Sequence, residues 1–210
     1  MALRLTSVPE WTREAVRKVI AAHANVFEDP PQIAVERGEL TAEKARVTLP
    51  VFTAGVPKRR DDRRAAIAHS KLWLKPKQIA WRTLLETRQG VTVAVELHVS
   101  RKKDSFHQLQ YGPSIQQTFD ALEMARRSRR LSKQEFSVGI LQIPALYFSA
   151  LWVTTNRGRE LYFPLVSFPG RLKAKRFYQR KQTVTALVDK WIERREAHKK
   201  LAAHKAKSKR

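Results

Sequence analysis

Few residues in this 210-residue chain have the types and spacing that catalysis needs, and the clearest group is Glu96 with His98. Residues 91–99 alternate Val or Leu with other residues, which is typical of a β-strand, so Glu96 and His98 project from the same face. A histidine oriented by a carboxylate is the usual start of general-base chemistry. With His107 and Asp104 nearby, the group is compatible with phosphodiester cleavage. The alternative, which we favour, is a strand with one ordinary solvent-exposed face.

Other catalytic patterns are missing from the sequence. There is no Cys, which excludes disulfides, thiolate metal sites and a Cys nucleophile. The seven Gly form neither a phosphate-binding loop nor a dinucleotide fingerprint, and no Gly-x-Ser-x-Gly occurs. The six His are scattered and never stand in His-Glu-x-x-His spacing. We therefore expect no cofactor and no metal site, and we favour a protein that is not an enzyme.

The charge is the strongest signal. The chain has 42 Lys and Arg against 19 Asp and Glu, a formal net charge of +23. Residues 1–100 hold 17 bases and 11 acids, whereas residues 101–210 hold 25 bases and 8 acids, so the two parts carry +6 and +17. Residues 171–210 alone hold 15 bases and three acids, a net of +12. A basic end of this kind is typical of proteins that bind nucleic acid or an anionic surface.

Two basic segments are the best candidates for phosphate contacts. Residues 126–130 contain four Arg and no acid, although the same run would also suit the last turn of a helix because it complements the helix dipole. Residues 173–181 interleave bases with Phe177 and Tyr178, and we expect Tyr178 to be exposed for base stacking. An amphipathic helix with extended basic side chains is the competing interpretation. The candidate binding residues are Arg126, Arg127, Arg129, Arg130, Lys173, Lys175, Arg176, Tyr178, Arg180, Lys181, Arg194, Arg195, Lys199 and Lys200.

These observations predict a non-catalytic protein that binds nucleic acid with low specificity, RNA or single strands being favoured, and that loses affinity steeply as salt rises. The alternative is an interaction module for an acidic protein or an anionic surface. A small phosphodiesterase based on Glu96 and His98 is the third interpretation. The lack of Cys and of an apolar leader favours an intracellular location, cytoplasmic, or nuclear in a eukaryote.

The order of the expected elements predicts an α+β fold, with mainly antiparallel sheet packed against three helices and a basic C-terminal helix and tail. Apolar spacing predicts helices over residues 11–25, 115–125 and from about 175 onward. Expected strands include residues 46–53, 91–99, 136–143, 146–155 and 160–168, and Pro50 suggests a sheet edge or a bulge. Residues 136–156 lack charge, and we interpret them as two buried strands meeting near Pro144 rather than a membrane span.

The domain prediction divides the chain at a basic linker. Residues 1–57 form an N-terminal helix and strand region, 58–66 the linker and possible boundary, 67–196 the main α+β domain, and 197–210 a basic tail. A weak internal similarity runs across this division. Trp81-Arg-Thr and Trp152-Val-Thr each precede a Gly turn, in a run of strands that leads to a helix. Duplication and chance explain this similarity about equally well.

Overall fold

The computed structural model describes residues 7–23, 45–56, 67, 75–86, 92–99, 106–129, 131, 135–168 and 172–207. Within these residues the helices are α1 (Glu10–His23), α4 (Pro113–Arg127) and α5 (Arg180–Lys207), with a short 3-10 turn η3 (Pro144–Leu146). The strands are β1 (Ala45–Thr53), β2 (Lys77–Glu86), β3 (Thr92–His98), β4 (Phe106–Tyr111), β5 (Phe136–Ile143), β6 (Phe148–Thr155), β7 (Glu160–Pro164) and β8 (Tyr178–Gln179).

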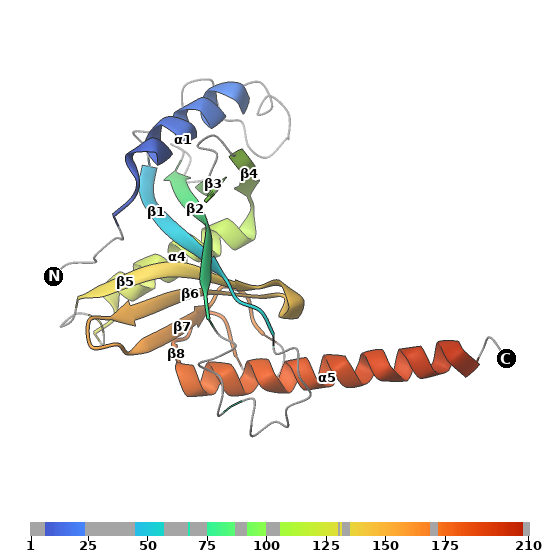
Figure 1. Cartoon of the computed structure of the whole chain (residues 1–210). Helices are drawn as coiled ribbons and strands as arrows, with labels where there is room; N and C mark the ends of the chain where they lie inside the picture. Colours follow the sequence, from blue (N-terminus) through green and yellow to red (C-terminus); the bar gives the residue numbers. More distant parts are fainter. Residues whose placement is uncertain are drawn as a thin grey trace.

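These strands belong to one eight-stranded sheet with the order β4-β3-β2-β1-β5-β6-β7-β8. Neighbouring strands are antiparallel except β1 and β5, which pair in parallel from Val51 with Ile140 to Thr53 with Gln142. The sheet therefore consists of two four-stranded meanders that meet at this short parallel contact (Figure 1). The predicted α+β fold, with mainly antiparallel sheet and three helices among the described residues, is confirmed.

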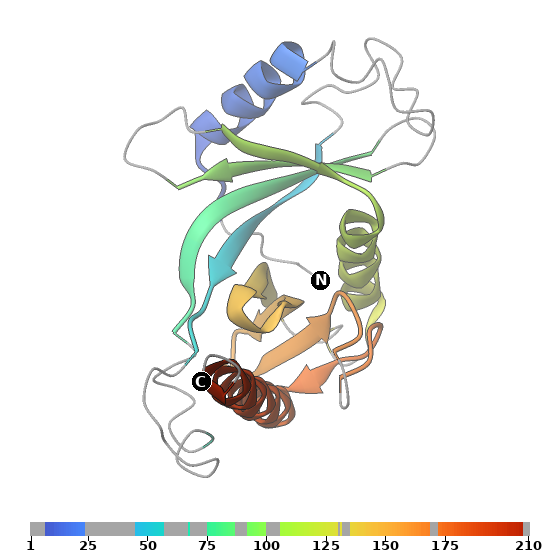
Figure 2. The same ribbon diagram turned by 90° about the vertical axis from the view of Figure 1, so that its right-hand side faces the viewer.

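Helices cover both faces of the sheet. On β3, Ala94 packs in the same core as Ile115 and Leu122 of α4, whereas the alternate residues Val93 and Val95 pack with α1. On β5 to β7, one set of alternate residues packs with α4 and the other set packs with α5. The helix α4 thus lies on one face, where it joins the two meanders, and α1 and α5 lie on the other face at its two ends (Figure 2).

The uncharged stretch of residues 136–156 forms β5, η3 and β6, so the prediction of two buried strands meeting near Pro144 is confirmed. Val138 and Ile140 pack toward α4, and Leu141 and Ile143 pack toward α5, which explains why the run is apolar on both of its faces. In the part of the chain that the structure describes, no helix combines the length and the apolar character needed to cross a bilayer.

The expectation that β3 has one solvent-exposed face is wrong. Val93, Val95 and Leu97 are buried on one face, and Ala94 and Glu96 are buried on the other. The alternation in the sequence is real, but α1 covers the first face and the core beneath α4 includes the second. A polar residue on this strand therefore needs a partner inside the protein.

Pro50 does not mark a sheet edge, because β1 lies in the middle of the sheet between β2 and β5. The other interpretation, a bulge, fits better, since the β1–β2 register shifts between Val51 and Phe52. The parallel pairing with β5 begins at Val51, directly after the proline. The part of β1 before Val51 pairs with β2 but not with β5. Pro50 lacks an N–H, so it suits the last position of this part, which has a strand partner on one side only.

The last helix begins at Arg180, five residues later than the apolar spacing indicated. Tyr178 and Gln179 pair with β7 as the short strand β8, and Lys175 has a left-handed backbone with φ 62°. Phe177 therefore lies outside the helix and packs edge-to-face on Phe163, with ring centroids 5.1 Å apart. Strand pairing here overrides the helical spacing of the sequence.

The proposed linker at residues 58–66 lies outside the described residues, so the domain division stays a prediction. The sheet itself is continuous from β1 to β8 across the two predicted regions. Residues 197–207 of the predicted tail continue α5. The two Trp-x-Thr segments lie on β2 and β6, each the second strand of a meander that leads to a helix.

Candidate nucleic-acid interface

The helix α5 has two parts with different surroundings. In its first part Val184, Leu187, Val188 and Trp191 are buried against β5 to β7. After Ile192, none of the described side chains as far as residue 204 is buried. Figure 1 shows the helix running on past the end of the sheet. We call residues 194–207 the projecting helix.

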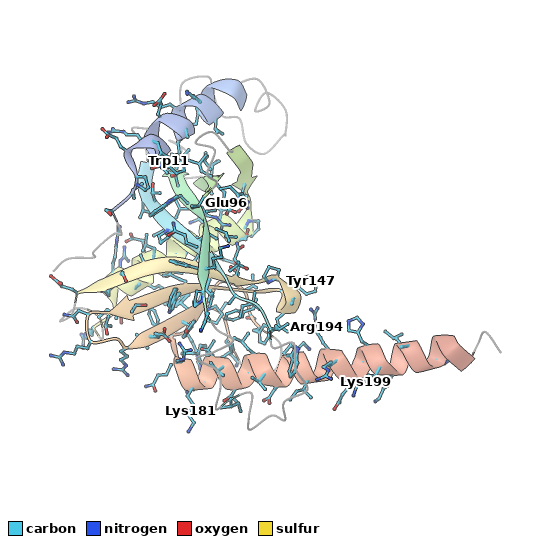
Figure 3. All side chains as sticks on the ribbon, viewed as in Figure 1. Trp11, Glu96, Tyr147, Lys181, Arg194 and Lys199 are labelled. Carbon is cyan, nitrogen blue, oxygen red and sulfur yellow. The ribbon has the colours of Figure 1, made fainter. Side chains whose placement is uncertain are left out.

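The projecting helix is strongly basic. Its fourteen residues hold six Lys or Arg and one acidic residue, Glu196. Lys199 and Lys200 are exposed, and Figure 3 shows Lys199 on this part of α5. Of the candidate binding residues, the structure brings Arg194, Arg195, Lys199 and Lys200 together here, within about two turns of one helix.

At the base of the projecting helix Arg194 contacts the turn that joins β5 to β6. Its Nη1 donates a hydrogen bond to the Ala145 carbonyl oxygen at 2.5 Å, and its Cζ lies 4.3 Å from the centroid of the Tyr147 ring. Figure 3 shows the two side chains facing each other. Tyr147 is 78% exposed. The sequence interpretation missed Tyr147, although an aromatic residue just after the turn signal Pro144 could have drawn attention to it.

The start of α5 carries a second basic group at the opposite end of the helix. Arg180 is engaged in an ion pair with Glu160, whereas Lys181 is exposed. The preceding segment adds three exposed bases, which are Lys173, Lys175 and Arg176. From Lys181 to Lys200 the helix rises about 28 Å, at about 1.5 Å per residue, so these residues and the projecting helix form separate basic groups.

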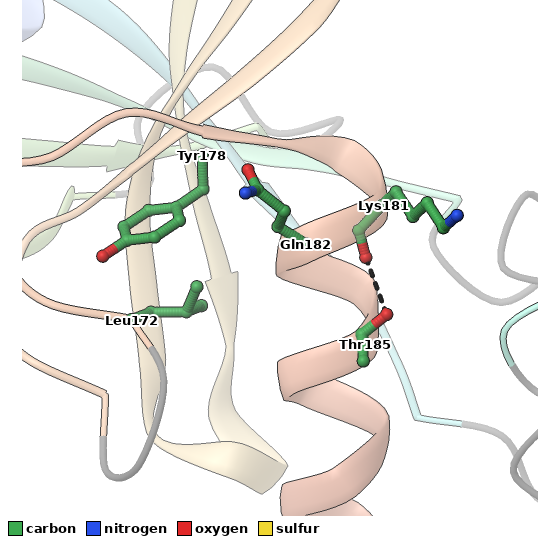
Figure 4. A pocket seen from close by; sticks show the side chains of 5 residues that line it. All are labelled: Leu172, Tyr178, Lys181, Gln182 and Thr185. Carbon is green, nitrogen blue, oxygen red and sulfur yellow. Dashed lines mark hydrogen bonds between the residues drawn. The ribbon is translucent and has the colours of Figure 1, made fainter.

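Tyr178 does not have the exposure that we expected. Its side chain is half-buried, and its hydroxyl oxygen accepts a hydrogen bond from the backbone N–H of Lys173 at 2.9 Å. Together with the first turns of α5 it lines a cavity of about 350 Å³ (Figure 4). The residues around this cavity are Leu172, Tyr178, Lys181, Gln182 and Thr185. A ring held in this way has less open surface for stacking than Tyr147.

The Arg run after residue 125 lies at the C-terminal end of α4. Arg126 donates to Glu123 at 2.8 Å, and Arg127 lies 3.9 Å from the same carboxylate. Both arginines occupy the last turn of the helix, where positive charge is favourable. For these two residues the structure supports the alternative that the run complements the helix dipole. Arg129 is exposed, and Arg130 lies outside the described residues.

Two further arginines, which the sequence interpretation treated only as parts of a hairpin turn, extend the basic surface near α4. Arg157 and Arg159 are exposed in the turn between β6 and β7. The N–H of Asn156 in this turn donates to the Glu135 carbonyl oxygen at 3.1 Å, next to the start of β5. The turn therefore lies beside the segment that connects α4 to β5.

In the candidate general-base group, the Glu96 carboxylate is bonded to an arginine and not to His98. Arg82 Nε and Nη2 donate to Glu96 Oε2 at 2.8 and 2.5 Å, and both side chains are buried. A carboxylate committed to a buried arginine serves the fold, because each charge satisfies the other. His98 is half-buried at the end of β3. The backbone of His107 belongs to β4, and Asp104 lies outside the described residues. No metal-binding cluster of His, Asp and Glu occurs among the described residues.

Comparison of the chain with protein-family models, curated proteins and solved structures found no match.

Proposed function

We propose that this protein binds nucleic acid without catalysis, with low sequence specificity and with RNA or single strands favoured. The observation that supports this proposal best is the projecting helix. It carries the exposed Lys199 and Lys200 past the end of the sheet, and none of its described side chains is buried. Phosphate contacts from such a surface carry no sequence information, so we expect the sequence specificity to be low.

The physical cost of the projecting helix also supports the proposal. After Ile192 no described side chain as far as residue 204 is buried, so packing against the body adds little to the stability of this part of α5. Like charges four residues apart, such as Arg195 and Lys199, destabilise it further. Bound phosphates would remove this repulsion, so a polyanion is the partner whose charge suits the helix best.

The exposed bases elsewhere would extend the contact. Lys181 and the preceding basic segment lie at the other end of α5. Further arginines lie at the end of α4 and in the turn between β6 and β7, which belongs to the meander β5 to β8 that α5 covers. A flexible single strand can follow separated phosphate contacts more readily than a rigid duplex can. This is the reason that we favour single strands or RNA.

The test is a salt titration of the affinity for a single-stranded oligonucleotide, measured by fluorescence anisotropy. Deleting residues 197–210 removes six Lys or Arg and no acidic residue. It removes no described side chain that is buried, so the body should still fold. Since each lost phosphate contact lowers the slope of log affinity against log salt by about 0.7, we expect a reduction of up to about 4.

A matched pair of variants separates the position of the charge from its amount. Lys199→Gln with Lys200→Gln should lower the slope by about 1.4, because two contacts are lost. Arg13→Gln with Lys77→Gln removes two exposed bases from α1 and β2 and should leave the slope nearly unchanged. Equal effects of the two pairs would show that only net charge matters. An unchanged slope after the deletion would show that the projecting helix is not the interface.

The competing partner classes have their own outcomes. Nucleic acid that co-purifies, seen as a high ratio of absorbance at 260 nm to that at 280 nm, supports the proposal. Absence of binding at low salt, together with flotation on vesicles that contain anionic lipid, would replace it with surface binding. Cleavage of the oligonucleotide by purified protein would favour the phosphodiesterase interpretation.

A further inference from the structure

We propose that Tyr147 is a stacking platform for one unpaired base, so that the protein distinguishes single-stranded from double-stranded nucleic acid. This inference rests on the proposed function and names the ligand feature that the site would recognise. Tyr147 is 78% exposed at the turn between β5 and β6. It is the most exposed of the large hydrophobic side chains among the described residues.

The backbone of Tyr147 is unusual for a large residue. It has φ 52° and ψ 37°, the left-handed conformation that Gly or Asn adopts more easily. Its N–H donates to the Pro144 carbonyl oxygen at 3.0 Å, which closes the tight turn. A bulky aromatic residue in this conformation is a strained choice, and such strain is often found where a side chain is needed for function.

The ring is held from one side. The Arg194 guanidinium lies over one face, with its Cζ 4.3 Å from the ring centroid, and Arg194 is itself anchored to the Ala145 carbonyl oxygen. The high exposure of Tyr147 leaves the other face open to solvent. An ordered ring with one open face loses little freedom when a base stacks on it, which favours binding.

The neighbouring helix supplies the phosphate contacts that a stacked nucleotide needs. His198 and Leu201 follow Arg194 at four and seven residues, so they share its face of α5, and both are exposed. Arg195 and Lys199 occupy the adjacent face, four residues apart. A strand with one base on Tyr147 can therefore continue along the projecting helix. In a duplex every base is already stacked and paired, so Tyr147 has no base to receive.

The experiment compares three proteins on a single strand and on a duplex of equal length. Tyr147→Asn removes the ring and suits the left-handed backbone, whereas Tyr147→Phe keeps the ring. We expect Tyr147→Asn to weaken binding of the single strand by roughly 5- to 150-fold, the range for one lost base–aromatic stack. Duplex affinity should change less than about 2-fold, and the salt slope should stay the same, since no charge is lost. Tyr147→Phe should bind like the unaltered protein.

The outcomes separate this inference from the proposed function. Unaltered affinity of Tyr147→Asn for the single strand overturns the stacking site and leaves the proposed function intact. An equal loss for single strand and duplex also overturns it, because the ring would then only support the fold. If the unaltered protein binds neither oligonucleotide, both proposals are wrong. Photocrosslinking of the unaltered protein to an oligonucleotide with 4-thiouridine gives a check that needs no variant: a crosslink at Tyr147 supports the site, and crosslinks only elsewhere overturn it.

Discussion

The buried pair of Arg82 and Glu96 allows the most direct test of how the fold uses its charged residues. The two side chains are 5% and 4% exposed and lie on neighbouring strands, where Arg82 is the register partner of Glu96. Substituting Glu96→Gln removes the negative charge while nearly preserving the shape. It leaves the Arg82 guanidinium buried without a compensating charge, which is strongly destabilising.

The expected loss is large. Removing one partner of a buried ion pair costs about 3–5 kcal/mol of unfolding free energy. For a chain of this size each kcal/mol moves Tm by about 2–4 °C, so Tm should fall by roughly 6–20 °C. The exposed pair of Glu14 and Lys18, with N–O distance 3.3 Å, provides the control. Glu14→Gln should cost no more than about 1 kcal/mol.

The assay is thermal unfolding of the single variants and of the double variant Arg82→Met with Glu96→Leu. The double variant removes both buried charges and fills the space with apolar atoms, so its stability should return close to that of the unaltered protein. Two results would refute the reasoning. One is a loss for Glu96→Gln no greater than that for Glu14→Gln, and the other is a double variant that is less stable than the single one.

Three other predictions each concern a single residue elsewhere in the sheet. Burial, and then the charge of Glu160, raise the pKa of Tyr162 above its ordinary value of 10.0, so the folded chain keeps the phenol neutral where the unfolded chain ionises it. The resulting stabilisation of the folded state is complete below about pH 10 and is lost as pH rises further. Tm of Tyr162→Phe should therefore fall less steeply at alkaline pH than Tm of the unaltered protein. Gly139→Ala should cost about 1–3 kcal/mol in denaturant unfolding, because its Cβ would lie 2.7 Å from Phe52 Cε2 and 3.0 Å from the Pro50 carbonyl oxygen, whereas Gly55→Ala meets nothing within 4 Å and should be nearly neutral. His98→Ala should leave oligonucleotide affinity within about 2-fold in the anisotropy assay, and a larger loss would place β3 in the interface.

The sequence predicts the local elements well where a single regular pattern covers them. The apolar stripe of α1, the stripe of α4 and the uncharged run through β5 and β6 all correspond to observed elements. It predicts less well where contacts between distant residues decide the structure. The spacing of Phe177 with Val184 suits a helix, but pairing of Tyr178 with Tyr162 on β7 delays the helix to Arg180.

In the candidate site, too, the sequence predicts the local pattern but not the contacts between distant residues. The concentration of bases toward the C-terminus can be counted directly, and the structure adds that those from Arg194 to Lys207 lie on a helix that runs beyond the sheet. Tyr178 was expected to be exposed, but it lines a cavity instead, because the chain before α5 folds back on it. Tyr147 has no distinguishing pattern in the sequence beyond its nearness to a turn, and its contact with Arg194 places it beside the basic helix.

Charge and apolar spacing are properties of the chain itself, so the sequence alone determines the basic C-terminal part, the class of fold and the lack of familiar catalytic motifs. Burial depends on which segments meet. The tertiary structure alone decides that β1 and β5 join two meanders in parallel and that both faces of β3 are covered. It also decides that Glu96 is committed to Arg82, because a carboxylate on a strand is available or engaged according to what lies across the sheet from it.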